Sequence, residues 1–103
     1  MAHTVTRKPI TGHSMQVALI IRKQIGVVAF MEVGARGFMY DENSLYFDAK
    51  PKSRIVRVVV TLDPSDTYTV RMVNKKTGDT IWEESDIYND SLPTVIRTLI
   101  RHL

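Results

Sequence analysis

The acidic residues of this sequence have the clearest potential for chemistry, because paired carboxylates can act as general acid and base. Two such pairs occur, Glu83 with Glu84 and Asp63 with Asp66. Acid–base catalysis requires both groups to converge on one pocket. Adjacent residues of a strand instead point to opposite faces, and the run DPSD at residues 63–66 is typical of a turn. We therefore predict no catalytic residues and no enzymatic activity.

Metal and phosphate binding are the other chemistries that the residue types could support. His3 and His13 lie in a polar N-terminal stretch without a third ligand beside them, and the chain contains no cysteine. The turn GARG at residues 34–37 could offer backbone amides and Arg36 to a phosphate. It lacks the Lys and Ser/Thr of a P-loop and the third glycine of a dinucleotide fingerprint. The sequence predicts no metal site, no cofactor and no small-molecule substrate.

Length and composition indicate one soluble domain. The chain has 103 residues, of which 44% are hydrophobic and 24% charged, enough for a single modest core. No apolar run approaches the length of about 18 residues that a membrane span needs, and the N-terminus lacks the apolar region of a secretory signal. The absence of cysteine fits a reducing compartment. We expect a protein of the host cell cytoplasm without a membrane partner.

The charge is divided into separate acidic and basic segments. The formal net charge is +3, a mild excess for a protein that binds duplex nucleic acid. Acids concentrate in residues 79–90, whereas bases gather in residues 22–23, 50–57, 71–76 and 97–101. A surface of both signs suits a protein partner at least as well as nucleic acid.

The most strongly patterned stretch is residues 54–73, which predicts two strands joined by the turn at residues 63–66. Alternate residues on one face of this hairpin are apolar, as in a half-buried sheet. They are Val56, Val58, Val60 and Leu62 in the first strand and Tyr68, Val70 and Met72 in the second. The opposite face is basic and partly apolar, so it could bind a partner.

The remaining elements are predicted from periodicity, caps and breakers. A helix is expected from Met15 to about Gln24. Residues 27–33 (VVAFMEV) are an apolar run of ambiguous type, and the glycines on either side favour a strand over a continuation of the helix. Further strands are expected at residues 45–49 and 80–84, and an amphipathic helix follows Ser91. The predicted fold is an α+β domain, with a four- or five-stranded antiparallel sheet and an N-terminal and a C-terminal helix covering its valine face.

Residues 1–14 have no periodicity and contain Pro9 and Gly12, so we predict a flexible arm ahead of a single domain at residues 15–103. Met15 could serve as the natural start, which would make the arm an extension. A resemblance supports this boundary. Four segments between residues 15 and 92 resemble a group of small phage- and plasmid-borne proteins. They are residues 34–38 (GARGF), 41–47 (DENSLYF), 60–70 (VTLDPSDTYTV) and 87–92 (IYNDSL).

The resemblance implies an origin in a mobile element and no catalytic residues, because the group has no established activity. The chain differs from the group at Thr69, where the group tends to have an acid, and after Leu92, where this tail is more basic.

Two non-enzymatic functions follow. The first is binding to a protein partner, or self-association, through the open face of the hairpin. Its contact residues would be Ile55, Arg57, Val59, Arg71 and Val73. The alternative is an accessory protein that contacts nucleic-acid phosphates. Its contact residues would be Lys52, Arg54, Arg57, Arg71, Lys75 and Lys76.

Overall fold

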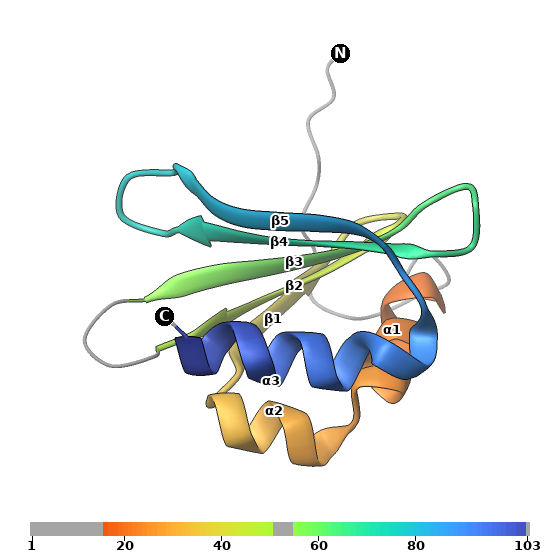
Figure 1. The fold of residues 1–103 in the computed structure, drawn as a ribbon, viewed down its shortest axis with the longest axis horizontal. Helices are drawn as coiled ribbons and strands as arrows, with labels where there is room; N and C mark the ends of the chain where they lie inside the picture. The colour runs from red at the N-terminus through yellow and green to blue at the C-terminus, as the bar shows by residue number, and fades with distance from the viewer. Residues whose placement is uncertain (1–15, 51–54, 103) are drawn as a thin grey trace.

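The computed structural model describes residues 16–50 and 55–102, which form an α+β fold with one five-stranded sheet (Figure 1). The strands follow one another in chain order across the sheet, and each neighbouring pair is antiparallel. The elements in chain order are α1 (Gln16–Ile25), α2 (Val27–Val33), β1 (Arg36–Tyr40), β2 (Ser44–Ala49), β3 (Val56–Leu62), β4 (Tyr68–Asn74), β5 (Thr80–Ile87), a short 3-10 turn (Asn89–Ser91) and α3 (Leu92–His102). The predicted fold class is confirmed.

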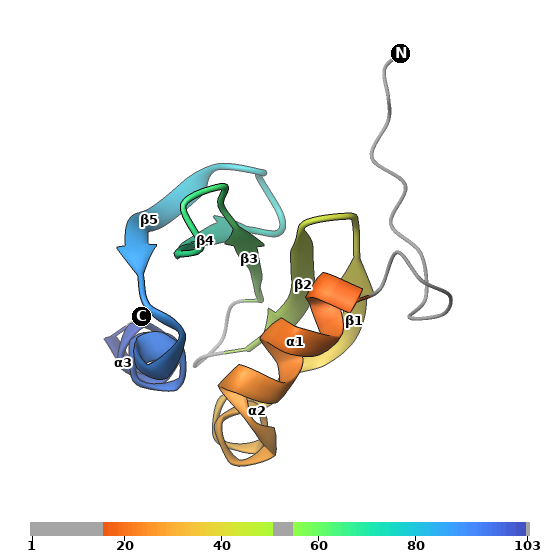
Figure 2. The same ribbon diagram turned by 90° about the vertical axis from the view of Figure 1, so that its right-hand side faces the viewer.

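All three helices lie on the same side of the sheet (Figure 2). In that view α1 is drawn across β1 and β2, α2 lies below these strands, and α3 lies below β5. The opposite side of the sheet carries no helix in the described part of the chain. We call that side the open sheet face.

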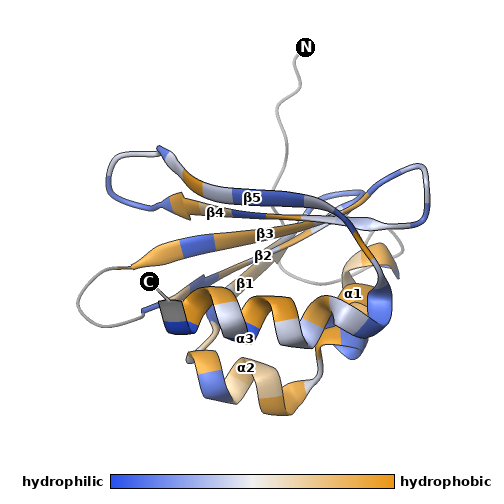
Figure 3. Cartoon of the chain, viewed as in Figure 1, coloured by the Kyte–Doolittle hydropathy of each residue, from blue (hydrophilic) through white to orange (hydrophobic). Residues whose placement is uncertain are grey.

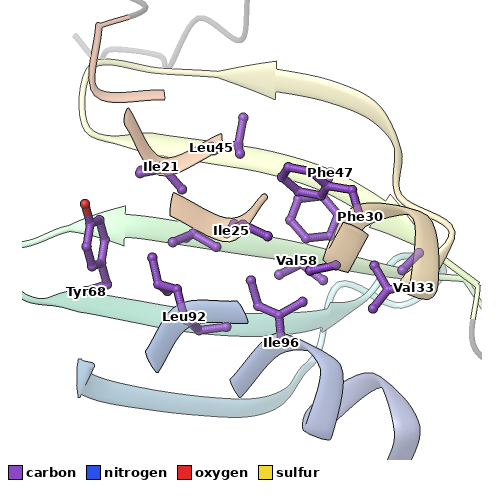
Figure 4. Packing of buried hydrophobic residues seen from close by; sticks show 14 of the residues in the cluster. Ile21, Ile25, Phe30, Val33, Leu45, Phe47, Val58, Tyr68, Leu92 and Ile96 are labelled. Carbon is purple, nitrogen blue, oxygen red and sulfur yellow. The ribbon is translucent and has the colours of Figure 1, made fainter. Parts of the chain in front are cut away.

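The core lies between the sheet and the helices, as the alternation of the central hairpin predicts. Val58, Val60 and Met72 are fully buried on the helix side of β3 and β4. Figure 4 shows the contributing side chains from both layers. They include Leu45 and Phe47 from β2, Ile21 and Ile25 from α1, and Leu92 and Ile96 from α3. Alternate apolar residues on a strand and residues spaced by three or four on a helix therefore form one core.

The prediction of a strand at residues 27–33 is wrong, because this segment is the helix α2. Its buried residues are Ala29, Phe30 and Val33, which share one face of a helix but would fall on both faces of a strand. Gly34 ends the helix with φ +66°, and the Ala35 amide donates to the Phe30 carbonyl, as in a glycine C-cap. Burial of this face outweighed the strand preference of three β-branched valines.

Two contacts hold the helices to the rest of the fold. The Tyr68 hydroxyl donates a hydrogen bond to Gln24, which joins the start of β4 to α1. Arg97 Nε on α3 lies 2.7 Å from a Glu32 carboxylate oxygen on α2, an ion pair without hydrogen-bond geometry. Polar contacts thus join α1 to the sheet and α2 to α3, in addition to the core.

Candidate protein-interaction surfaces

The open sheet face brings together most of the residues that the sequence singled out. Tyr46, Val59 and Arg71 form one row across β2, β3 and β4, because each is paired with the next in the register. Arg57 belongs to the neighbouring row, between Asp48 and Val73. The prediction of which hairpin residues share a face is therefore correct, since these residues lie on the side of the sheet opposite the valine core.

The structure corrects the prediction that Val59 is an exposed contact residue. Its side chain is only 6% exposed although no helix covers this face in the described part of the chain. Long neighbours on both sides of a central strand, Tyr46 and Arg71, explain this burial. Val73 is half-buried, and only Ile55 and Arg71 remain exposed. The apolar part of the open sheet face is consequently small.

Asp48 gathers the charge of this face into one cluster. Its carboxylate accepts a hydrogen bond from Arg57 Nε at 3.0 Å and another from Lys75 Nζ at 2.6 Å. Burial on its own raises the pKa of Asp48, but the bonds and charges of Arg57 and Lys75 outweigh burial and hold that pKa below the ordinary value of 3.8. The cluster therefore keeps Asp48 ionised and uses two of the bases that could have contacted a partner.

Hydroxyl groups on the same face also bond to one another. Ser44 and Thr61 are 2.7 Å apart across β2 and β3, and the Thr69 hydroxyl donates to Asp63 at 2.6 Å. Ser85 on β5 lies 3.1 Å from the same Thr69 oxygen. Polar groups that already have partners gain little from a new one. The open sheet face is thus largely satisfied within the chain.

Of the residues predicted to bind nucleic acid, Lys52 and Arg54 lie outside the described residues. Arg57 and Lys75 share Asp48, and Arg71 is paired in the register with Glu83 on β5. Lys76 is exposed in the β4–β5 loop. The structure brings the described bases of this set to one part of the sheet. It also places carboxylates beside them that the sequence reasoning did not expect there.

A different surface carries the exposed apolar side chains. Five large hydrophobic residues on α1 and α2 face solvent, and we call them the α1–α2 surface. They are Leu19, Ile20, Val27, Val28 and Met31. Met31 is 76% exposed and Val27 69%. Figure 3 shows that α2 is coloured apolar along nearly its whole length, including the side turned away from the sheet.

Beside this surface runs an open groove of about 700 Å³ between the two helices and β1. It is lined by Leu19, Arg22, Lys23, Gly26, Val27, Phe30, Met31, Gly34, Ala35 and Phe38. Its floor is aromatic, since the rings of Phe30 and Phe38 meet edge to face with their centroids 5.0 Å apart. Phe47 supports Phe30 from the core at 5.3 Å, again edge to face. Such packing makes the floor rigid.

The charge of the groove is of one sign. Within the described part of the chain its lining includes Arg22 and Lys23 but no acid. The Arg22 guanidinium carbon lies 5.4 Å from the centroid of the Phe38 ring, so it is held over the floor. Glu32, the acid of α2, contacts Arg97 instead. The groove therefore combines an apolar floor with a basic rim.

Sequence reasoning missed this surface because it read α2 as a strand. The available signal was the run VVAFMEV itself, in which a helix burying Ala29, Phe30 and Val33 must leave its other valines and its methionine outside.

Among the described residues, no helix has the length and apolar character needed to cross a bilayer, and no His, Cys, Asp and Glu side chains gather into a possible metal site. Glu83 lies opposite Arg71 and Glu84 opposite Val70, so this acidic pair points to two faces of the sheet. Comparison of the chain with protein-family models, curated proteins and solved structures gave no match.

Proposed function

We propose that this is a non-enzymatic binding protein of the phage- and plasmid-borne type, which contacts a protein partner through the α1–α2 surface. The observation that carries the proposal is the exposure of Val27 and Met31 beside an apolar groove. The sequence resemblance supports the mobile-element origin. The divergence of Glu83 and Glu84 supports a role without catalysis.

The hydrophobic effect favours such a contact. Burial of apolar surface stabilises by roughly 25 cal/mol per Å², and contiguous exposed apolar patches on soluble domains commonly mark interaction sites. The solvent side of a surface helix is ordinarily polar. On α2 it holds Val27, Val28 and Met31 against one acid, Glu32. A partner that covers this side would remove apolar surface from water at little cost in polar groups.

The open sheet face supports the same function less well. Its central valine is buried, and its arginine beside Asp48 is already paired, with 19% of the Arg57 side chain exposed. A partner there would have to compete with bonds inside the chain. We therefore assign partner contact to the helices and a structural role to the paired groups of the sheet.

Site-specific photo-crosslinking in the native host tests the proposal. A benzoylphenylalanine placed at Met31 should give a discrete protein adduct, whereas the same group at Arg71 on the open sheet face should not. Both positions are exposed, so they form a matched pair. The captured partner protein would then be purified without the crosslink, and its binding to the wild-type chain would be measured. Adducts from position 71 alone, or none from position 31, would contradict the proposed surface.

A second candidate function, contact with nucleic-acid phosphates, is favoured by the distribution of charge along the strands. One end of the sheet carries Lys50, Lys75 and Lys76 in its loops. The other end carries acids in its turns, among them Asp41 and Asp66. Binding of short DNA duplexes or single strands would weaken steeply between about 50 mM and 200 mM salt if phosphate contacts drive it. Lys75→Ala with Lys76→Ala should then flatten this dependence, and an unchanged slope would exclude the basic end.

A further inference from the structure

The α1–α2 groove specifies the chemistry of its occupant. We infer that it binds an amphipathic segment of another protein, in which large apolar residues are accompanied by Asp or Glu. This inference rests on the proposed function and adds the class of partner.

The floor of the groove fits apolar anchors. Half-buried Phe38 presents an aromatic surface, and the buried rings of Phe30 and Phe47 pack beneath it. Met31 stands at the edge with a flexible thioether side chain that adapts to different shapes. A preformed apolar groove with one adaptable residue is a common receptor for a peptide that inserts two or three side chains.

The rim of the groove fits acids. Arg22 and Lys23 are exposed, and the described lining has no carboxylate to offset them. A segment with acids beside its apolar anchors would pair with both bases, which raises the association rate and disfavours basic competitors. A neutral or basic segment would leave two positive charges without compensation at the contact.

The same charge argues against two other occupants. Residues 1–15 of this chain contain Arg7 and Lys8 and no Asp or Glu, so their composition does not complement the rim. In a two-fold dimer built on this groove, the same patch of each copy would meet its equivalent. Arg22 and Lys23 of the two copies would then be brought together. An acidic segment of a different protein is the occupant that the charges favour.

Selection from a displayed library of random peptides of about 16 residues, enough for about four helical turns, tests the inference without assuming a sequence. The purified full-length protein is the bait. We expect enriched peptides to combine large apolar residues with Asp or Glu. The affinity of a synthesised winner would be measured by fluorescence anisotropy for the wild type and for matched variants.

The variants separate groove contact from general exposure. Met31→Glu should weaken binding by about tenfold or more, because it places an acid in the apolar part of the groove. Tyr88→Glu adds the same charge at an exposed residue outside both the α1–α2 surface and the groove lining, and should change the affinity less than about twofold. Lys23→Glu should weaken the binding of acidic peptides by about fivefold and reduce the salt dependence of that binding. Circular dichroism would confirm that each variant is folded.

The outcomes distinguish the inference from the proposed function. Winners that lack acids but lose affinity with Met31→Glu would overturn the inference and leave the protein-binding proposal intact. Winners indifferent to Met31→Glu would reject the groove, and with it both. A molecular mass that rises with concentration and falls with Met31→Glu would identify a second copy as the occupant and overturn the inference. Binding to anionic lipid vesicles that Met31→Glu abolishes, without peptide binding, would overturn it in favour of a lipid surface.

Discussion

The open sheet face and the α1–α2 surface both combine apolar and basic residues, but they differ in how those residues are partnered. On the sheet, Arg57 bonds to Asp48 and Val59 is covered by its cross-strand neighbours. On the helices, Met31 and Val27 project into solvent beside a groove without acids in its described lining. A sheet supplies each side chain with neighbours from adjacent strands, whereas the solvent side of a surface helix offers only neighbours three or four residues away on the same helix. Residue type alone is thus a poor guide to a free surface.

The largest effect should come from charging the buried valine of the open sheet face. Val59→Glu is expected to lower the free energy of unfolding by roughly 3 kcal/mol, because it buries a carboxylate without a fitted partner. Met31→Glu on α2 is the matched control and should change this free energy by less than about 0.5 kcal/mol. Urea denaturation followed by Trp82 fluorescence would measure both. Equal stability of the two variants would erase the contrast between the surfaces.

The Asp48 cluster should give the next largest effect and a distinct pH dependence. Asp48→Asn is expected to cost about 1.5–3 kcal/mol at neutral pH, the range for hydrogen bonds to charged groups. The folded-state pKa of Asp48 lies below 3.8, so ionised Asp48 stabilises the fold above that pH. This contribution is lost as the pH falls through the lowered pKa.

Wild type and Asp48→Asn should therefore differ most in stability at neutral pH and converge below pH 3.8. Thermal unfolding across the acid range would measure the difference. A difference that stays constant with pH would show that the carboxylate charge is not what holds this cluster.

A smaller effect is expected where the sheet supports α1. Tyr68→Phe removes the hydrogen bond to Gln24 and should cost about 0.5–1.5 kcal/mol. Burial raises the pKa of Tyr68 above 10.0, with Gln24 opposing this and Asp66 adding to it. The neutral phenol therefore favours the folded state, and its contribution declines as the pH rises above 10.0.

Tyr88→Phe is the control for this prediction, since Tyr88 is 65% exposed. It should leave denaturant unfolding unchanged at neutral pH. If both variants unfold alike, the bond to Gln24 does not fix α1 to the sheet.

The smallest effect is expected on the helical side, at the ion pair between Glu32 and Arg97. Both side chains are substantially exposed, so Glu32→Gln should cost no more than about 0.5 kcal/mol and less at high salt. Thermal unfolding at two salt concentrations would measure this. A loss comparable to that of Asp48→Asn would mean that the two surfaces hold their charges equally firmly.

The sheet and its core could be predicted from the sequence because strand alternation is a local signal. Val58, Val60 and Met72 occupy the face expected of them, and the strand at residues 80–84 is correct but extends to Ile87. Helix α2 could not be identified so directly. Its valines favour a strand, whereas the helix lets Phe30 pack against Phe38 on β1 and Phe47 on β2.

The candidate site was less predictable than the fold because it depends on neighbours rather than on patterns. The contact of Asp48 with Arg57 requires the register between β2 and β3, and its contact with Lys75 joins residues far apart in the sequence. The groove requires the placement of α2 against β1. Period-two alternation identified the open sheet face correctly, but it could not show that Val59 is covered there.

The most direct test uses the partner protein that is captured by photo-crosslinking at position 31. Once purified, its affinity would be measured for the wild-type chain and for the variants Met31→Glu and Arg71→Glu. Isothermal titration calorimetry should show about tenfold or greater weakening for Met31→Glu and less than about twofold for Arg71→Glu. Unchanged affinity with Met31→Glu and a loss with Arg71→Glu would place the partner on the open sheet face and contradict the account.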